Sequence, residues 1–343
     1  MTVLLLSNMA RILITGGAGF IGSSLAEALV SDQSNFVIIV DNLLTGKTEN
    51  LPSPDLKNWV FEQCDVNDYR SIEQVFKKYE PEYVFHFAAV VGVERTLNNP
   101  LLVLEDIEGS KNIAKLCVSH KVKRVFYASS SEVYGDPFEV PQKEETTPIN
   151  ARLPYAAVKN ISEIIFKTYG EKFGLTHTIF RFFNTYGPRQ SSDFVISRFI
   201  KQAMQGDPIT VHSPGSQTRT FCFISDTIET ILKIFYQNIM MNDTINIGND
   251  DEISMLKLAE TVKTIIGSNS KIVIIPPRKE GEILRRKPDI TKMLSILKRP
   301  LVKLEKGITE IVRTWSESRG KSIPAFPKPP LELFHSAYLS GNK

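Results

Sequence analysis

The sequence predicts an α/β protein with a doubly wound parallel sheet and a smaller α/β lobe in its second half. The first observation is that short apolar runs alternate with segments of helical periodicity up to about residue 185. This alternation is typical of βαβ units whose parallel sheet is covered by helices on both faces. The second observation is that the first apolar run, 12–15, ends in a glycine-rich turn before a helical segment. Together they predict a sheet of the nucleotide-binding type.

The predicted elements follow one another in the order that this architecture requires. The predicted strands of the first half are the apolar runs 12–15, 36–40, 60–63, 83–87, 124–128 and 179–183. The predicted helices between them are 23–30, 72–78, 103–118 and 155–172. After about residue 186 the pattern loosens into helices at 193–205 and 254–266 and extended segments at 208–213, 219–224, 244–247 and 272–275. The first half is therefore interpreted as consecutive βαβ units and the second as a less regular lobe.

These patterns divide the chain into a main domain, a lobe and two ends. We expect the nucleotide-binding domain to span 9–185, with segments near 219–250 returning to its sheet. The substrate lobe is expected to span 186–320. Residues 1–8 are predicted to be an N-terminal extension, and the proline-rich tail 321–343 is predicted to be irregular.

Composition narrows the class of protein. Of 343 residues, 42% are hydrophobic and 23% are charged, which is typical of a globular chain and argues against disorder. The formal net charge of +3 is too small to suggest a dedicated nucleic-acid binder. Cys64, Cys117 and Cys222 lie far apart, which argues against a disulfide framework or a metal site and fits a cytoplasmic protein. No apolar run reaches the roughly 18 residues that span a bilayer, so no membrane partner is expected.

The glycine-rich turn and a later acid predict a dinucleotide site. Gly16, Gly19 and Gly22 allow a tight turn and a close approach of the backbone to a pyrophosphate. The helix that starts near Phe20 directs its free N–H groups at the same point. Asp41 ends the second strand about 20 residues later, where a carboxylate accepts hydrogen bonds from the adenosine ribose. Because an acid there repels a 2′-phosphate, the sequence favours NAD over NADP.

A second group of polar residues predicts acid–base chemistry. Tyr155 and Lys159 lie one helical turn apart on one face, and a nearby ammonium lowers the pKa of a phenol. A phenol with a lowered pKa is suited to act as a general base at neutral pH. The Ser-Ser-Ser-Glu cluster at 129–132 follows a predicted strand, at the edge where open α/β sheets bind ligands. Each pattern alone is common, and it is their occurrence in this order that indicates an active site.

With these motifs in this order, the chain resembles the extended short-chain dehydrogenases that modify nucleotide sugars. The matching stretches are 12–22, 40–42, 86–89, 129–135, 155–159, 181–189, 215–226 and 285–290. The resemblance implies a Rossmann fold, bound NAD in the first domain and a UDP-sugar as the expected partner in the second lobe. It also implies a homodimer formed by two helices of each subunit, for which 103–118 and 155–172 are the candidates.

The resemblance also implies roles for individual residues. Tyr155 takes the proton of the sugar 4-hydroxyl, and Lys159 lowers the tyrosine pKa and holds the nicotinamide ribose. Ser130 binds the sugar 4-oxygen, with Ser131 and Glu132 beside it. The implied cofactor contacts are Gly16, Gly19, Phe20, Ile21, Gly22, Asp41, Asn42, Asp65, Val66, Phe87, Ala88, Ala89, Tyr155 and Lys159. The implied contacts to the substrate diphosphate are Asn184, Arg219 and either Arg285 or Arg286.

One position departs from the family pattern. Where relatives carry asparagine in the helix after the fourth strand, this chain has Asp106. An ionised aspartate cannot donate a hydrogen bond from its side chain. The departure therefore puts a proton-relay role for this position in question, but not the fold.

The reactions of the family share a 4-keto sugar and differ in the step that follows. An epimerase returns the hydride to the other face of the sugar and needs little beyond Ser130, Tyr155 and a roomy pocket. A decarboxylase loses carbon dioxide from a uronic acid, and both 130–132 and the Arg-Lys-Pro at 286–288 match family decarboxylases. The segment 90–95 looks more like epimerase-type relatives. We therefore expect a UDP-hexose 4-epimerase, with a UDP-glucuronate decarboxylase as the alternative.

Three further outcomes rank lower. A 4,6-dehydratase usually carries Thr-Asp-Glu where this chain has Ser130, Ser131 and Glu132, so its aspartate is missing. A 4-dehydrogenase would stop at the ketone. An inactive NAD-binding sensor is disfavoured because such relatives often lose the tyrosine or the lysine, and both are present here.

Overall fold

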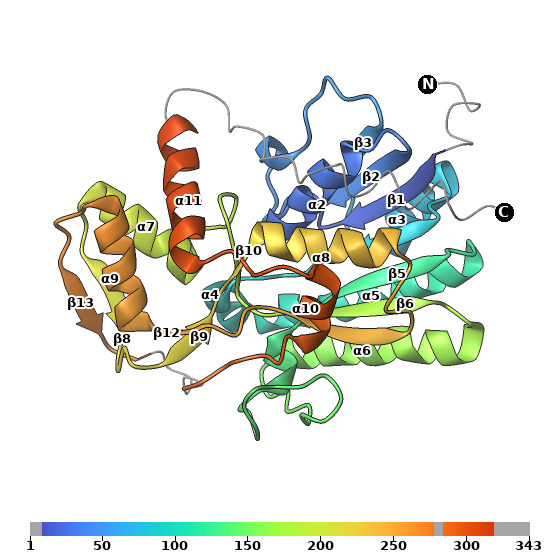
Figure 1. Cartoon of the computed structure of the whole chain (residues 1–343). Helices are drawn as coiled ribbons and strands as arrows, with labels where there is room; N and C mark the ends of the chain where they lie inside the picture. Colours follow the sequence, from blue (N-terminus) through green and yellow to red (C-terminus); the bar gives the residue numbers. More distant parts are fainter. Residues whose placement is uncertain (1–8, 278–283, 319–343) are drawn as a thin grey trace.

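A seven-stranded parallel sheet forms the centre of the molecule and confirms the predicted fold class. The computed structural model describes residues 9–277 and 284–318. Its large sheet has the order β11-β6-β5-β4-β1-β2-β3, with every neighbouring pair parallel (Figure 1). The strand bounds are β1 Ala10–Thr15, β2 Asn35–Asp41, β3 Trp59–Gln63, β4 Tyr83–His86, β5 Arg124–Ser130, β6 His177–Phe182 and β11 Asp243–Ile247. The strand order reverses between β1 and β4, which is where such sheets open a crevice for ligands.

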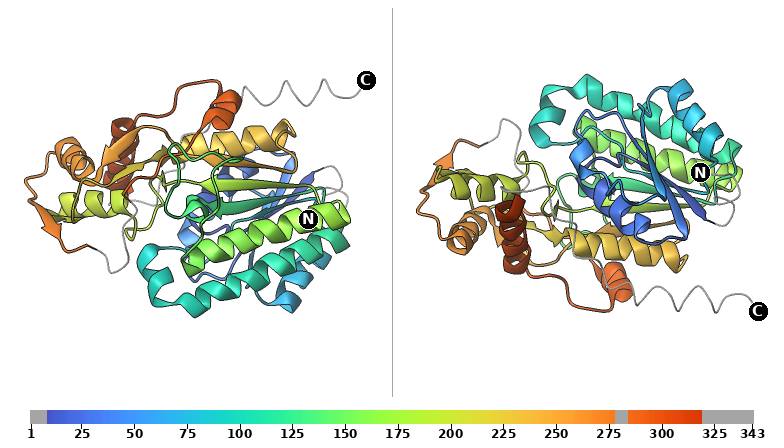
Figure 2. Two further views of the ribbon diagram at one scale, coloured as in Figure 1. Left: turned by 90° about the horizontal axis from the view of Figure 1, so that it is seen from below. Right: turned by 90° about the horizontal axis from the view of Figure 1, so that it is seen from above.

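Helices cover both faces of the large sheet, as Figure 2 shows. Along β1, Ile12 and Ile14 belong to one apolar core and Leu13 to the other, and all three are fully buried. The helices on the first face are α2 Phe20–Val30 and α8 Ile224–Tyr236. Those on the second face are α3 Tyr69–Tyr79, α5 Pro100–Ser119 and α6 Pro154–Phe173. This double covering explains why the strands are almost continuously apolar.

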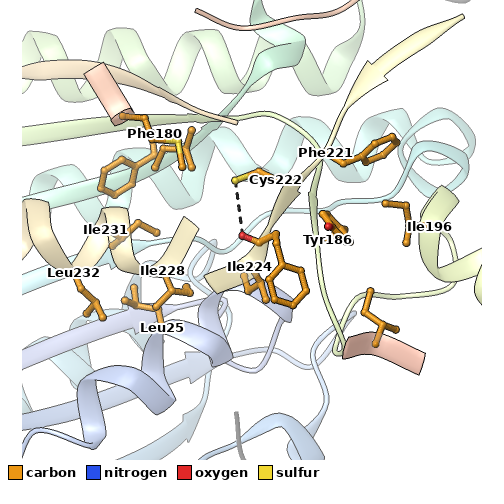
Figure 3. Packing of buried hydrophobic residues seen from close by; sticks show 14 of the residues in the cluster. Leu25, Phe180, Tyr186, Ile196, Phe221, Cys222, Ile224, Ile228, Ile231 and Leu232 are labelled. Carbon is orange, nitrogen blue, oxygen red and sulfur yellow. Dashed lines mark hydrogen bonds between the residues drawn. The ribbon is translucent and has the colours of Figure 1, made fainter. Parts of the chain in front are cut away.

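The chain leaves the large sheet after β6 and later returns to it. Leu25 of α2, Ile228 and Ile231 of α8 and Phe180 of β6 pack in one core (Figure 3). β11 follows α8 and pairs with β6 at the edge of the sheet. The segment 224–247 therefore belongs structurally to the sheet layer, although segments of the lobe precede and follow it.

The remaining segments form a smaller lobe beside the carboxyl ends of the strands (Figure 1). Its longer helices are α7 Val195–Gln205, α9 Met255–Ile266 and α11 Leu304–Ser318. Its strand pairs are β7 Thr185–Tyr186 with β10 Cys222–Phe223, β8 Ile209–His212 with β13 Ile272–Ile275, and β9 Thr218–Thr220 with β12 Glu252–Ser254. The predicted N-terminal extension and proline-rich tail lie outside the described residues.

Several helices are absent from the sequence-based prediction, namely α4 Val93–Asn98, α8, α10 Thr291–Leu297 and α11. α8 lies between the sheet, α2 and α10 with most of its residues buried, and the prediction overlooked the helical spacing of its polar residues Glu229 and Lys233. α4 and α10 are too short to show a periodic pattern. Across the described ranges, none of the helices has the length and apolar character needed to cross a membrane.

Candidate active site

The candidate site is a cleft of about 390 Å³ at the carboxyl ends of the parallel strands. β1, β2, β4 and β5 end at it, and α2 and α6 begin at it. The residues singled out in the sequence that line it are Gly16, Gly19, Phe20, Ile21, Gly22, Asp41, Asn42, Asp65, Val66, Phe87, Ala88, Ala89, Ser130, Ser131, Glu132, Tyr155, Lys159, Asn184 and Arg286. The fold thus brings together segments that lie far apart in the sequence.

At Gly16 and Gly22, the turn between β1 and α2 and the first turn of α2 leave no room for a side chain. Gly16 has a φ of +68°, and a Cβ at this position would lie 2.7 Å from the backbone nitrogen of Ala88. A Cβ at Gly22 would overlap the carbonyl oxygen of Gly16. The bare backbone therefore forms the cleft wall here, and the N-terminus of α2 meets it. Such a site favours an anion such as a pyrophosphate.

Asp41 lies at the end of β2, beside the same turn. Its Oδ2 accepts a hydrogen bond from the backbone N–H of Ala18 at 3.0 Å, and its Oδ1 accepts one from that of Leu43 at 2.8 Å. Burial raises the pKa of Asp41, and these backbone donors act against the rise. The carboxylate therefore shapes the turn as well as lining the cleft. A glycine cradle, a helix N-terminus and a carboxylate after the second strand fit NAD.

The tyrosine and lysine of α6 lie in the cleft, but their electrostatics differ from the prediction. Lys159 donates a hydrogen bond from Nζ to the carbonyl oxygen of Ala128 at 2.7 Å, and Nζ lies 5.7 Å from the centre of the Tyr155 ring. Burial lowers the pKa of Lys159 to about 8, although the charges of Asp106 and Glu163 oppose this.

Burial outweighs the other influences on Tyr155, so its pKa is raised rather than lowered, and a lowering effect of Lys159 stays a prediction. Burial raises the pKa of the Tyr155 phenol, and the group that acts in the opposite direction is the Ser130 hydroxyl, through a hydrogen bond. The Lys159 ammonium donates its hydrogen bond to a backbone carbonyl rather than to the phenol oxygen. In the chain by itself, the phenol is thus the favoured form at neutral pH.

Glu132 and Arg286 form a forked ion pair inside the cleft. The Nη1–Oε1 and Nη2–Oε2 distances are 2.5 and 3.0 Å. Arg286 is only 5% exposed, so its charge is largely removed from water. Burial alone would raise the pKa of Glu132, but Arg286 and then the more distant Arg219 outweigh burial and lower it. Glu132 is therefore ionised at neutral pH, and the ion pair lies at the cleft wall.

The other predicted substrate contacts are divided between the cleft and the lobe. Asn184 lines the cleft and donates from Nδ2 to the carbonyl oxygen of Thr220 at 3.1 Å. Arg219 lies on β9, and its Nη1 donates to the carbonyl oxygen of Thr218 at 2.7 Å. Arg285 is exposed and forks onto Glu252, with N–O distances of 2.8 and 2.6 Å. Arg219 and Arg285 thus lie beside the lining rather than in it, and a diphosphate contact by either stays a prediction.

Asp106 lines the cleft and acts there as an acceptor. Its Oδ2 accepts a hydrogen bond from the backbone N–H of Val90 at 2.8 Å. Burial raises the pKa of Asp106, while the Val90 N–H and the charge of Lys159 act against the rise. The position therefore fixes the loop after β4 to α5 by accepting, which requires no side-chain donor.

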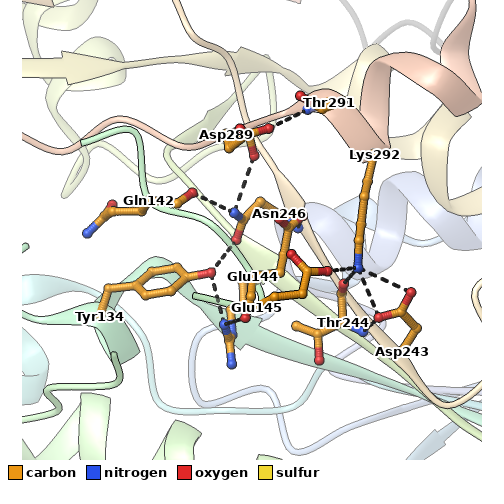
Figure 4. A network of polar contacts seen from close by, with 11 residues as sticks. Tyr134, Gln142, Glu144, Glu145, Asp243, Thr244, Asn246, Asp289, Thr291 and Lys292 are labelled. Carbon is orange, nitrogen blue, oxygen red and sulfur yellow. Dashed lines mark hydrogen bonds and ion pairs between the residues drawn. The ribbon is translucent and has the colours of Figure 1, made fainter. Parts of the chain in front are cut away.

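A buried polar network outside the cleft holds the segment that carries Arg286 (Figure 4). The Tyr134 hydroxyl donates to Oδ1 of Asn246 at 2.8 Å, and Asn246 Nδ2 donates to the carbonyl oxygen of Gln142 at 3.0 Å. The backbone N–H of Gln142 donates to the carbonyl oxygen of Lys287 at 2.8 Å. Sequence reasoning missed this network because its members come from separate segments and none of them forms a local motif.

Sequence reasoning also missed part of the lining. Thr96 of α4, together with Gln190 and Phe194 of the loop before α7, faces the cleft. α4 is short and the loop has no regular pattern, so neither gives a signal of its own. Thr96 reaches the site because α4 comes shortly after β4, whereas Gln190 and Phe194 reach it through the approach of the lobe to the sheet edge.

Comparison with known proteins places this site in context. The sequence model of the NAD dependent epimerase/dehydratase family matches residues 12–248. UDP-glucuronic acid decarboxylase 6 of Arabidopsis thaliana is 37% identical over 311 residues, which cover 88% of this chain and 87% of that protein. UDP-N-acetyl-alpha-D-glucosaminuronate decarboxylase of Bacillus cytotoxicus is 36% identical over 328 residues, covering 90% and 98%. The structure of a UDP-glucose 4-epimerase from Thermus thermophilus in complex with NAD is similar with a TM-score of 0.82 at 28% identity, covering 90% and 99%.

Proposed function

The chain belongs to the NAD dependent epimerase/dehydratase family, and we propose that it is a decarboxylase of a UDP-activated uronic acid. The observation that carries the proposal is the forked Glu132–Arg286 ion pair in the cleft that Tyr155 also lines. A uronic acid brings a carboxylate into the site, which a buried guanidinium is suited to bind. The two decarboxylases with 37% and 36% identity support the same choice.

The cofactor of this family is NAD, and the residues of the cleft fit it. The glycines of the β1–α2 turn would hold its pyrophosphate, Asp41 its adenosine ribose and Lys159 its nicotinamide ribose. NAD bound there would supply a reversible hydride acceptor, and its positive charge would favour the Tyr155 phenolate against the effect of burial.

The acid–base groups of the chain act on the 4-hydroxyl of the sugar. Tyr155, as phenolate, takes the hydroxyl proton while the C4–H bond is oxidised. Ser130, which hydrogen-bonds to the Tyr155 hydroxyl, binds the same sugar oxygen and keeps it aligned with the phenol. When the ketone is reduced again, Tyr155 returns the proton.

Decarboxylation takes place at the ketone stage. The bond between C5 and the carboxylate carbon breaks, carbon dioxide leaves, and the electron pair is delocalised as the enolate of the 4-ketone. C5 then takes up a proton, and reduction of the ketone leaves a UDP-pentose with no net oxidation. In this scheme Arg286 holds the sugar carboxylate, and ionised Glu132 keeps the guanidinium in place.

The 4-epimerase that the sequence favours is the second candidate. Its support is the segment 90–95 and the fold shared with a UDP-glucose 4-epimerase. The two decarboxylases named above are 37% and 36% identical to this chain, whereas the epimerase structure is 28% identical, which supports the decarboxylase. The sugar of a UDP-hexose 4-epimerase also carries no carboxylate that Arg286 would bind.

The proposal is tested by offering the full chain one substrate at a time. The purified protein with NAD is incubated with UDP-glucuronate, UDP-N-acetylglucosaminuronate or UDP-glucose, and the products are separated and weighed by mass spectrometry. We expect one of the two uronates to lose carbon dioxide, and which one reacts identifies the sugar. A new product of unchanged mass from UDP-glucose, without decarboxylation, would replace the proposal by the epimerase. NAD binding without conversion of any of the three would favour the sensor.

A further inference from the structure

His86 occupies the centre of a buried chain of hydrogen bonds that the chemistry above does not use. It is the last residue of β4 and is 1% exposed. Its Nδ1 lies 2.8 Å from Oγ1 of Thr15 on β1, and its Nε2 lies 3.4 Å from Oγ of Ser110 on α5. The ring thus joins the sheet to the helix layer on its second face.

The partners of the ring determine which nitrogen carries the hydrogen. Thr15 Oγ1 accepts from the backbone N–H of Ala88 at 3.2 Å, and within the described residues the acceptor for its own hydrogen is Nδ1 of His86. A neutral ring that accepts at Nδ1 carries its hydrogen on Nε2 and donates it to Ser110. Ser110 Oγ in turn donates to Oγ of Ser162 at 2.8 Å. All the hydrogen-bond donors therefore point in one direction, from Ala88 through His86 to Ser162.

One end of this chain of hydrogen bonds lies in the cleft wall, and the other end lies on α6 close to Lys159. At one end, Ala88 lines the cleft, and its backbone lies so near Gly16 that a Cβ there would be 2.7 Å from the Ala88 nitrogen. At the other end, Ser162 lies on α6 three residues after Lys159 and hydrogen-bonds to the Tyr127 hydroxyl. Nζ of Lys159 lies 5.1 Å from the centre of the Tyr127 ring. The chain of bonds thus spans the distance between the cofactor side and the acid–base side.

The surroundings of the ring keep it uncharged. Burial lowers the pKa of His86 to about 3, and the ammonium of Lys159 acts in the same direction. The rings of Tyr127 on β5 and Phe166 on α6 pack against it, with centroids 5.8 and 6.0 Å away. A proton on Nδ1 would remove the acceptor of the Thr15 hydroxyl and place a second positive charge near Lys159.

We propose that His86 is a positioning residue of the active site, a neutral Nε2–H tautomer that fixes the wall at Ala88 relative to Lys159 on α6. The inference rests on the hydride-transfer part of the proposed function. It holds for the decarboxylase and for the epimerase alike, because both reactions pass through the 4-ketone.

The tautomer is tested without any substrate. The full chain, labelled with ¹⁵N at its five histidines, is followed by NMR between about pH 5.5 and 9, and the His86 signals are identified as those that move in Thr15→Val. We expect an Nε2–H tautomer that does not titrate in this range. An Nδ1–H tautomer, or a ring that takes up a proton near its ordinary pKa, would overturn the proposal. Loss of the proposed decarboxylation would leave this result unaffected.

The positioning role is tested by removing the hydrogen bonds on either side of the His86 ring. Thr15→Val and Ser110→Ala remove one hydroxyl each, and we expect kcat to fall about tenfold in each variant while KM for the nucleotide sugar stays within about twofold. Because both hydroxyls act through one ring, the double variant should lose little more than either single variant.

The control for Ser110→Ala is Ser119→Ala on the same helix, whose hydroxyl bonds only the local carbonyl of Leu116 within the described residues. It should leave kcat unchanged. Single losses that multiply in the double variant, or an unchanged kcat in Ser110→Ala, would show that the hydroxyls act locally and not through His86.

Discussion

The side chains of Arg286 and its neighbour Arg285 point in different directions, because successive side chains of an extended segment lie on opposite sides. Arg285 is bridged to Thr218 and turns outward to Glu252, so Arg286 turns inward to Glu132. The sequence predicts that one of the two arginines meets the substrate, but the alternation alone does not say which one. The choice depends on the register against β9, which is a tertiary contact.

The first prediction separates these two arginines. Arg286→Ala removes the cation that would hold the sugar carboxylate and leaves Glu132 without its partner, so kcat for carbon dioxide release should fall by roughly 100-fold or more. Arg285→Ala is the matched variant, and it should keep kcat within about twofold, with any effect confined to KM. Both are measured by steady-state kinetics on variants whose circular dichroism matches that of the parent. Equal losses of kcat in the two would contradict a special role for the buried pair.

Burial of the Lys159 ammonium in the site destabilises the folded chain. Its folded pKa of about 8 lies below its ordinary value of 10.5. The unfolded chain therefore binds more protons between these two values, and the free energy of unfolding rises with pH across that window. At neutral pH the buried ammonium destabilises the folded chain by about 3 kcal/mol.

The second prediction follows from this rise of the free energy of unfolding with pH. Lys159→Met should abolish turnover and yet raise Tm at pH 7, because it removes a charge that burial disfavours. The advantage in Tm should shrink above about pH 8 and vanish above about pH 10.5, where the lysine of the parent is neutral in both states. Thermal melts of the cofactor-free chains across this range measure it. A Met variant that melts below the parent at pH 7 would show that the hydrogen bond to Ala128 outweighs the burial of charge.

At the scale of elements, the sequence predicts the cofactor half better than the substrate half. The turn from Gly16 to Gly22 and the Tyr155–Lys159 pair are contiguous patterns whose geometry follows from one turn and one helix. The position of Arg286, by contrast, depends on Asn246 of β11 and on Gln142, which meet only after the lobe has folded against the sheet. α8 is a different case, because Glu229 and Lys233 lie one helical turn apart and give it a pattern that the prediction did not use.

The third prediction concerns the β1–α2 turn as an element. In Gly22→Ala the new methyl would overlap the carbonyl oxygen of Gly16, so the turn must open and NAD affinity should fall at least tenfold, or about 1.4 kcal/mol. Gly267→Ala at the end of α9 is the control, because its φ is +68° and no atom lies within 4 Å of the added Cβ. It should lower stability by about 1 kcal/mol and leave NAD affinity unchanged. Titration calorimetry with NAD measures both affinities, and comparable losses would contradict a local effect of the turn.

At the scale of the whole molecule, α5 and α6 lie side by side and expose apolar side chains. Leu101 of α5 is 76% exposed, and Ile164 and Phe173 of α6 are 54% and 62% exposed. Single exposed apolar residues are ordinary, but several on two adjacent helices are typical of an interface. These are the helices through which the family resemblance implies a homodimer, so we propose that two copies of the chain pair across this face.

The last prediction tests that pairing. Multi-angle light scattering at micromolar concentration should give twice the mass of one chain, because covering these side chains removes apolar surface from water. Ile164→Glu places a charge on the exposed apolar face of α6 and should yield monomers, since burying an unpaired carboxylate is costly. Leu256→Glu, at a 40% exposed position on α9 of the lobe, should remain dimeric and controls for the general effect of a new surface charge. A monomeric parent, or a dimer that tolerates Ile164→Glu, would show that the exposed face of α5 and α6 is not where the chains meet.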